Sequence, residues 1–198
     1  NGATLDFSDI GIVPLDARAT GRANPTVEGL TATNLIENGD FASGVIYPFT
    51  SYAQIYSDDS LIGNYCLRSA GNNVATSGTK LTKFATARQG DVIIFVINYK
   101  VLSYSGGSIF SWVYEGTSEW SDSTRESIDV AIDGVWKQKI IRHTVINVET
   151  AIGWVIRPTV STSWEILIDG VSAFNLTSTF GAGNEPSEAD CAKIFSYF

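Results

Sequence analysis

The sequence predicts an all-β protein whose strands form either a β-sandwich or a barrel. The composition favours strands, because 12% of the 198 residues are aromatic and 18 are glycine, with abundant serine and threonine. At least eight short segments with strand periodicity follow one another, with turns every eight to twelve residues. The dipeptides Asn38-Gly39 and Asp133-Gly134 are typical of the turns between such strands.

The expected strands begin at residue 34 and end at residue 168. Residues 91–102 are apolar on both faces, which is typical of a central strand. Residues 164–168 alternate, so that Trp164, Ile166 and Ile168 share one face, and the following Asp169-Gly170 predicts a turn that closes this strand. The expected strands are 34–36, 52–56, 65–69, 91–102, 109–114, 128–132, 136–148, 152–156 and 164–168.

The pattern changes at the C-terminus, where residues 186–197 predict an amphipathic α-helix. Pro186 suits the first helical position, and Glu188 and Asp190 suit the positive end of the helix dipole. The apolar stripe of this helix must pack against the sandwich or against a partner; it consists of Cys191, Phe195 and Phe198, with Ala192 and Ile194 beside them.

Three regions follow from these patterns. Residues 1–33 have no clean period, and they are either an N-terminal arm or linker, or an ordinary first strand of the same domain. Residues 34–178 form the β-sandwich, and residues 179–198 form a Gly-rich turn and a C-terminal helix packed on it. The chain contains no Met and starts at Asn1, so we expect it to be one module of a longer protein.

Composition excludes several classes of function. The net charge of -8, from 13 Lys and Arg against 21 Asp and Glu, argues against nucleic-acid binding. The longest apolar run, residues 92–97, is far shorter than the roughly 20 residues of a membrane-spanning helix, and no signal peptide is visible. Cys66 and Cys191 predict two separate free thiols, with a single long-range disulfide as the alternative.

Enzyme motifs are absent from the sequence. There is no G-x-S-x-G, no H-E-x-x-H and no C-x-x-C, and His143 is the single histidine. Gly181 and Gly183 precede the expected helix but lack the Lys-Ser/Thr of a phosphate-binding loop, so they predict a tight turn instead. We therefore expect a protein that is not an enzyme.

The aromatic residues indicate a possible ligand site. Phe110, Trp112 and Tyr114 alternate along one expected strand and so project from one face. Sugars stack on aromatic faces while neighbouring polar groups bind their hydroxyls, although aromatic residues also commonly fill the core of a sandwich. The expected carbohydrate-binding residues are Trp112, Tyr114, Trp120, Arg142, Trp154 and Arg157.

Two acidic segments predict a cation site. Asp40 follows Asn38-Gly39 near the start of the expected sandwich, and Asp169 lies at the end of its last strand. First and last strands of a sandwich are often neighbours, so carboxylates and backbone carbonyls from both segments would suit a structural Ca²⁺. The alternative is that both aspartates only form turns.

Residues 34–44 read N-L-I-E-N-G-D-F-A-S-G, which resembles the opening strand of jelly-roll carbohydrate-binding modules. Residues 164–171, W-E-I-L-I-D-G-V, are similar to the closing strand of that family. The resemblance implies a jelly-roll β-sandwich with a short C-terminal helix, and a structural Ca²⁺ shared by the two segments. Ala42 stands where the family usually has an acidic residue, which removes one ligand.

Residues 175–186, N-L-T-S-T-F-G-A-G-N-E-P, resemble a signature that follows such modules in tail proteins of bacteriophages, chiefly those infecting Gram-positive bacteria. The resemblance implies a non-catalytic receptor-binding module at the tail tip or fibre of the virion, extracellular at the host surface. The implied partners are host cell-wall polysaccharide or teichoic acid and other tail proteins, without nucleic acid or membrane insertion. It also implies a homo-oligomer, a trimer, in the full-length protein.

Two other functions remain open. The sandwich would serve as a structural or decoration domain of the virion if its aromatic row were buried. Alternatively, it would be the accessory binding module of a cell-wall hydrolase, with the catalytic domain elsewhere in the parent protein. An exposed aromatic row beside polar groups favours the carbohydrate-binding role over the structural one.

Overall fold

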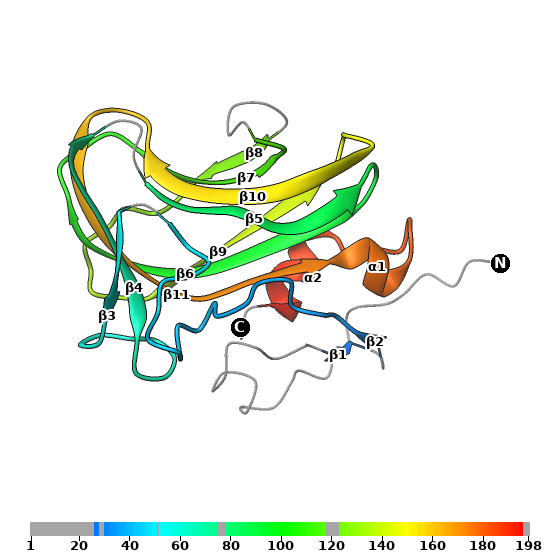
Figure 1. Ribbon diagram of the computed structural model, residues 1–198, viewed down its shortest axis with the longest axis horizontal. Coiled ribbons are helices and arrows are strands. Elements are labelled where there is room, and N and C mark those ends of the chain that lie inside the picture. The colour runs from blue at the N-terminus through cyan, green and yellow to red at the C-terminus, as the bar shows by residue number, and fades with distance from the viewer. Residues whose placement is uncertain (1–25, 28–29, 51, 75–77, 118–122, 196–198) are drawn as a thin grey trace.

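Two antiparallel β-sheets pack face to face in the computed structural model, which describes residues 26–27, 30–50, 52–74, 78–117 and 123–195 (Figure 1). The predicted all-β sandwich is confirmed. The four-stranded sheet has the order β5 (Thr79–Arg88), β10 (Glu149–Pro158), β7 (Ile109–Glu115) and β8 (Ser123–Ser127). The five-stranded sheet has the order β3 (Ala53–Tyr56), β4 (Cys66–Val74), β11 (Thr162–Asn175), β6 (Val92–Tyr104) and β9 (Lys137–Thr144).

The main core lies between the two sheets. Trp164, Ile166 and Ile168 of β11 all belong to it, as the alternation of that segment predicts. On the opposite sheet, Trp154 of β10 stacks on Phe95 of β6 with ring centroids 5.1 Å apart. These large rings join the sheets at the centre of the sandwich.

A second core covers the outer face of the five-stranded sheet. Residues 92–99 of β6 are buried on both faces, which confirms the expected central strand. Their outer side chains pack beneath α1 (Leu176–Phe180) and α2 (Glu188–Ile194). Phe174 and Phe195 stack with ring centroids 4.9 Å apart, so the C-terminal segment is fixed to the sandwich by an apolar interface.

The junction before α2 is stabilised by side chains of residues 175–186. The Thr177 hydroxyl accepts a hydrogen bond from the Val92 N–H (2.9 Å) and donates one to Glu185 Oε1 (2.5 Å). Glu185 Oε2 accepts from the Gly183 N–H (2.9 Å). Gly181 (φ 86°) and Gly183 (φ 83°) adopt backbone conformations that favour glycine. These residues therefore build the turn expected from the glycines, but it connects two helices and not a strand to a helix.

The observed α2 is shorter than the predicted helix. Ser187 is its N-cap and accepts from the Asp190 N–H, so Pro186 precedes the cap and is not the first helical residue. Glu188 and Asp190 lie in the first turn as predicted. Residues 196–198, including Phe198 of the expected stripe, lie outside the described part.

Two predicted turns are wrong. Asp169-Gly170 does not end its strand, because β11 continues to Asn175 through a register shift between Asp169 and Ser172, with Gly170 at φ 55°. Glycine in this conformation forms a β-bulge and leaves the strand unbroken. Asp133-Gly134 is no hairpin turn, since residues 128–132 are not a strand and the loop connects β8 to β9 in the other sheet.

The N-terminal region is described only from residue 26. β1 (Thr26–Val27) and β2 (Leu30–Thr31) pair with each other, and the Leu35 N–H donates to Ala173 O of β11 at 2.8 Å. Of the expected arm at residues 1–33, residues 1–25 and 28–29 lie outside the described part of the chain. None of the helices in the described ranges is long and apolar enough to cross a membrane.

Both cysteines are free thiols and buried, as predicted. Burial raises the pKa of each thiol, Cys66 and Cys191, to about 12. Both side chains therefore act as small apolar groups in the protein interior.

Candidate functional site on the outer face of the four-stranded sheet

Strand alternation places an aromatic row on the outer face of the four-stranded sheet. Phe110, Trp112 and Tyr114 of β7 project away from the main core, and Trp112 and Tyr114 form a separate cluster with Val155 of β10. Trp112 lies opposite Val155 on one side and Arg125 of β8 on the other. The structure thus confirms that the three rings share one face.

Two arginines pack against these rings. The Arg157 guanidinium carbon lies 4.5 Å from the centroid of the Trp112 ring. The Arg125 guanidinium carbon lies 4.8 Å from the Phe110 centroid and 5.5 Å from that of Trp112. At these distances the negative faces of the rings attract both cations. The arrangement combines apolar rings with hydrogen-bond donors.

Exposure differs along the row. Trp112 is 1% exposed, Tyr114 3% and Arg157 3%, whereas Phe110 is half-buried and Arg125 is exposed. A ligand approaching this face would therefore meet Phe110 and Arg125 first. Trp112 supports them from below.

Gly153 of β10 allows the Tyr114 ring to pack closely against the sheet. A Cβ atom at position 153 would lie 2.4 Å from Tyr114 Cζ and 2.7 Å from the Thr82 carbonyl oxygen. Figure 1 shows β5 and β10 bent into an arc whose hollow side faces away from the five-stranded sheet. The aromatic row lies on this hollow side.

The structure does not bring the six expected carbohydrate-binding residues together. Trp112, Tyr114 and Arg157 share the outer face, but Trp154 is fully buried between the sheets, where its Nε1–H donates to Ser111 Oγ at 2.8 Å. Trp154 is thus a core residue: successive side chains of a strand point to opposite faces, and its neighbour Val155 faces outward.

Arg142 lies far from this row on the other sheet. It stands opposite Ile94 on the face that α2 covers, where its charge acts on Glu185 and Cys191. Trp120 lies outside the described residues. The expectation of one platform made of all six is therefore corrected to a smaller group on the four-stranded sheet.

Arg125 was missed by the sequence reasoning. Residues 123–127 read S-T-R-E-S and form β8, an edge strand without a single apolar residue. Strand prediction from apolar periodicity cannot detect such a segment. The only sign of this strand in the sequence is that Arg125 and Glu126, which would point to opposite faces of a strand, stand between Ser123 and Ser127.

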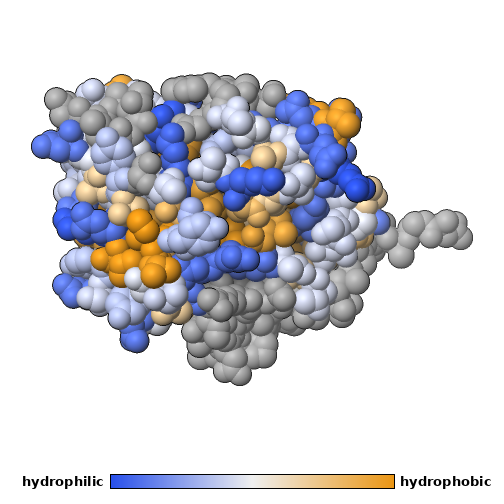
Figure 2. Space-filling view, viewed as in Figure 1, coloured by the Kyte–Doolittle hydropathy of each residue, from blue (hydrophilic) through white to orange (hydrophobic). Residues whose placement is uncertain are grey.

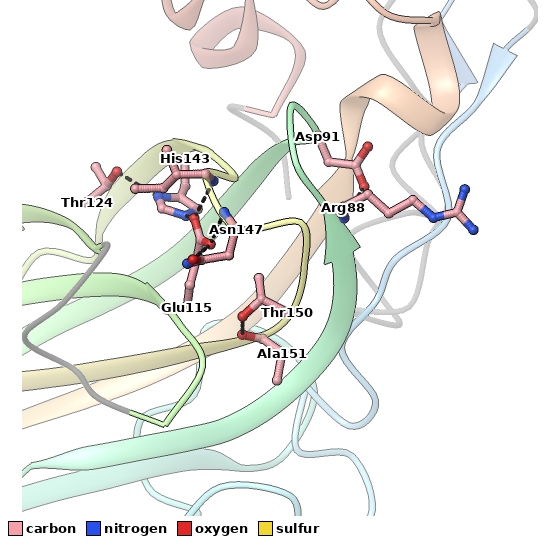
Figure 3. A network of polar contacts seen from close by, with 9 residues as sticks. Arg88, Asp91, Glu115, Thr124, His143, Asn147, Thr150 and Ala151 are labelled. Carbon is pink, nitrogen blue, oxygen red and sulfur yellow. Dashed lines mark hydrogen bonds and ion pairs between the residues drawn. The ribbon is translucent and has the colours of Figure 1, made fainter.

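A buried polar network closes one end of the sandwich (Figure 3). His143 Nε2 of β9 lies 3.0 Å from Glu115 Oε1 of β7, and its Nδ1 lies 2.9 Å from Thr124 Oγ1 of β8. Glu115 also accepts hydrogen bonds from the Ile146 N–H, the Asn147 N–H and the Asn147 side-chain amide. Four donors thus surround one carboxylate.

The surroundings of Glu115 favour its ionised form. Burial alone would raise the pKa of Glu115, but the hydrogen bonds from Ile146, Asn147 and His143 outweigh it and hold the pKa below its ordinary value. Every acceptor position of the carboxylate is used and both ring nitrogens of His143 are engaged. The network therefore stabilises the fold.

Asp40 and Asp169, the two expected metal ligands, lie close together. The Val171 N–H donates to Gly39 O at 2.9 Å, which joins the two segments. Both carboxylates are buried, and Asp169 accepts backbone hydrogen bonds from Leu61, Ile62 and Gly170. The pKa of Asp169 is raised to about 7, because burial and the charge of Asp40 together outweigh the three backbone donors, which lower it.

Two buried carboxylates that repel each other suit a hard cation as two of its ligands. The described residues contain no group of three or more His, Cys, Asp and Glu side chains that could hold a metal. Ca²⁺ prefers six to eight oxygens, so carbonyl oxygens and water would have to supply the rest. Asp40 and Asp169 supply only two carboxylate ligands, so a structural Ca²⁺ at this position stays a prediction.

Two hollows lie elsewhere on the surface. Figure 2 shows apolar residues gathered on the front face, where Figure 1 shows β3 and the segment before it. In the segment before β3, Val45 and Tyr47 are exposed and border a groove of about 550 Å³. A smaller hollow of about 310 Å³ is lined by Tyr52, Ala53, Gln54, Arg68 and Ala70.

No family model matches the sequence, and no curated protein is similar to it. Solved structures share the fold. The CBM22-1 xylan-binding domain of Xyn10C from Paenibacillus barcinonensis matches with a TM-score of 0.56 at 13% identity, covering 73% of this chain and 95% of that domain. A family 16 carbohydrate-binding module matches with a TM-score of 0.54 at 13% identity, covering 72% of this chain and 100% of that module.

One similar structure belongs to an enzyme. Arabinose-bound MgGH51 α-L-arabinofuranosidase matches with a TM-score of 0.60 at 16% identity, covering 83% of this chain but 29% of that one. At such identities the likeness concerns the fold. The chain has a two-sheet antiparallel β-sandwich fold like that of these modules, with short C-terminal helices.

Proposed function

We propose that this protein is a non-catalytic carbohydrate-binding module of a phage tail receptor-binding protein. Its ligand is a glycan of the host cell wall, polysaccharide or teichoic acid. Binding takes place on the outer face of the four-stranded sheet. The module acts at the tail tip or fibre, outside the host cell, beside other tail proteins.

The observation that carries this proposal is the aromatic row with its two arginines. Phe110 offers a half-buried ring, and Arg125 offers exposed guanidinium donors against it. Sugar rings stack their apolar C–H side on aromatic faces, and guanidinium groups donate to the oxygens around them. The row lies on a β-sheet, which holds the side chains at fixed spacing.

The phage role rests on residues 175–186. This segment resembles the signature of tail proteins, and its Thr177, Gly183 and Glu185 form the hydrogen-bonded junction that fixes the C-terminal helices. We propose a trimer for the full-length protein, in which several copies bind the wall together. Linked copies raise the overall affinity without any new contact, so weak single sites suffice.

A structural role in the virion is the second candidate. Trp112 and Tyr114 are 1% and 3% exposed, so most of the aromatic row is already packed within the protein. A decoration or spacer domain would need no more than this. An accessory role in a cell-wall hydrolase is a third candidate, supported by the similar domain within the arabinofuranosidase.

Binding to purified cell walls from a panel of Gram-positive bacteria tests the proposal. We expect the chain to sediment with the walls of some strains, and Phe110→Ala to reduce this at least tenfold with the fold intact. Arg88→Ala changes an exposed residue on β5 of the same sheet and serves as the control. Absence of wall binding across the panel, or equal binding by Phe110→Ala, would favour the structural role.

A further inference from the structure

We propose that the ligand of this face is an anionic glycan, whose phosphate or carboxylate groups bind Arg125. The inference rests on the proposed function, and it adds the charge of the ligand to it. The shared chemistry is a sugar polymer with oxyanions along its length. Teichoic acids with phosphodiesters and polysaccharides with uronate groups both have this chemistry.

The charge of the face is opposite to that of the chain. The net charge of the protein is -8, yet the centre of the outer face carries Lys80, Arg125 and Arg157. Lys80 and Arg125 stand on either side of the Val155–Trp112 pair in the register of the sheet. A group of cations on an otherwise acidic protein attracts anions locally, within about one Debye length of its surface.

Nearby carboxylates among the described residues do not reach this centre. Glu115 points inward and is held by His143 and the backbone, and Glu126 pairs with Lys139 of the other sheet. Strand alternation places Glu149 on the outer face, but it precedes Val155 by six residues along β10. At about 3.3 Å per residue it is about 20 Å away, beyond the Debye length in physiological salt.

Arg125 is prepared to bind an oxyanion. Its side chain is exposed, its guanidinium packs on Phe110 and Trp112, and it forms no ion pair with a carboxylate of the described residues. Arg68, by comparison, is paired with Glu165 at 2.7 Å. A guanidinium held over two aromatic rings still has N–H donors for the forked hydrogen bonds that suit phosphate and carboxylate.

Binding to three purified polymers tests the inference. The probes are poly(glycerol phosphate) teichoic acid, polygalacturonate and neutral dextran, measured by calorimetry at about 0.1 M and about 1 M NaCl, where the Debye length falls from about 10 Å to about 3 Å. The variants are Arg125→Ala, Arg125→Lys, and Arg88→Ala as the matched control on the same sheet.

The expected result is binding to at least one anionic polymer and none to dextran. Affinity should fall at least tenfold with Arg125→Ala and with the higher salt, less with Arg125→Lys, and not with Arg88→Ala. Preference for teichoic acid or for polygalacturonate identifies phosphate or carboxylate as the bound group.

Two results would overturn the inference in different ways. If dextran or other neutral wall glycans bind as tightly as the anionic ones, salt has no effect and Arg125→Ala binds normally, the charge assignment is wrong while the carbohydrate-binding role remains. If no glycan and no cell wall binds, the proposed function fails and the inference fails with it.

Discussion

His143 of β9 and Glu115 of β7 belong to different sheets and meet with 3.0 Å between Nε2 and Oε1, buried at one end of the sandwich. Lys139 and Glu126 form an ion pair between β9 and β8 along the same border. The two sheets are therefore joined there by polar contacts, whereas aromatic rings join them at the centre. The pair also fixes the loop after β9, since Ile146 and Asn147 donate to the same carboxylate.

Replacing Glu115 with alanine should destabilise the fold strongly. Three backbone or amide donors and the His143 ring would lose a buried acceptor, so we expect the free energy of unfolding to fall by about 3 kcal/mol. Chemical denaturation of both proteins measures this difference. Glu149→Ala, an exposed residue of the adjoining strand β10, should behave like the wild type. Equal losses in both variants would contradict the role of the network.

Acid should weaken the same network. The pKa of Glu115 lies below its ordinary value of 4.5 in the folded protein, so its stabilising contribution is fully present above about pH 4.5 and is lost as the pH falls through the folded-state pKa. The wild type should lose its advantage over Glu115→Gln progressively below about pH 4.5. Denaturation curves at a series of pH values measure it. A difference that stays constant down to pH 3, well below about 4.5, would show that folding does not lower the pKa of Glu115.

Local sequence patterns predicted which residues share a strand face, because alternation is a property of the chain alone. They placed Phe110, Trp112 and Tyr114 together on one side of β7, and Trp164, Ile166 and Ile168 together in the core. They also predicted the central position of residues 92–97, since a strand buried on both faces is apolar throughout.

Such local patterns do not predict which strands pair or in which register they pair. Whether Trp154 shares a face with Trp112 depends on register, and the observed pairing of Trp154 with Val113 places the two indoles on opposite sides of one sheet. Arg142 and Arg157 likewise belong to different sheets. The bulge at Gly170 uses the same residue types as a turn, so tertiary packing alone decides between them.

The separation of Trp154 from the outer face has a measurable consequence. Trp154→Phe should lower the free energy of unfolding by about 2 kcal/mol, because it leaves Ser111 Oγ without its donor and shrinks a buried ring. It should leave binding to cell walls unchanged. Phe110→Ala, on the outer face, should do the reverse, with weaker binding and a small change in stability. If Trp154→Phe stays stable and abolishes binding, Trp154 reaches the ligand after all.

Calcium should stabilise the protein through Asp40 and Asp169. A cation between two buried carboxylates would remove their mutual repulsion, which helps to raise the pKa of Asp169. A free Ca²⁺ concentration of about 100 times the dissociation constant would add about 2.7 kcal/mol to the free energy of unfolding. Thermal unfolding with Ca²⁺, with Mg²⁺ and with a chelator measures the effect.

Asp40→Asn should abolish the calcium dependence, whereas Asp129→Asn, at an exposed aspartate paired with Lys137, should keep it. A melting temperature that neither Ca²⁺ nor the chelator changes would contradict the calcium site. The Asp169 carboxylate would then serve only to accept its three backbone hydrogen bonds, which hold the loop at Leu61 and Ile62 against β11.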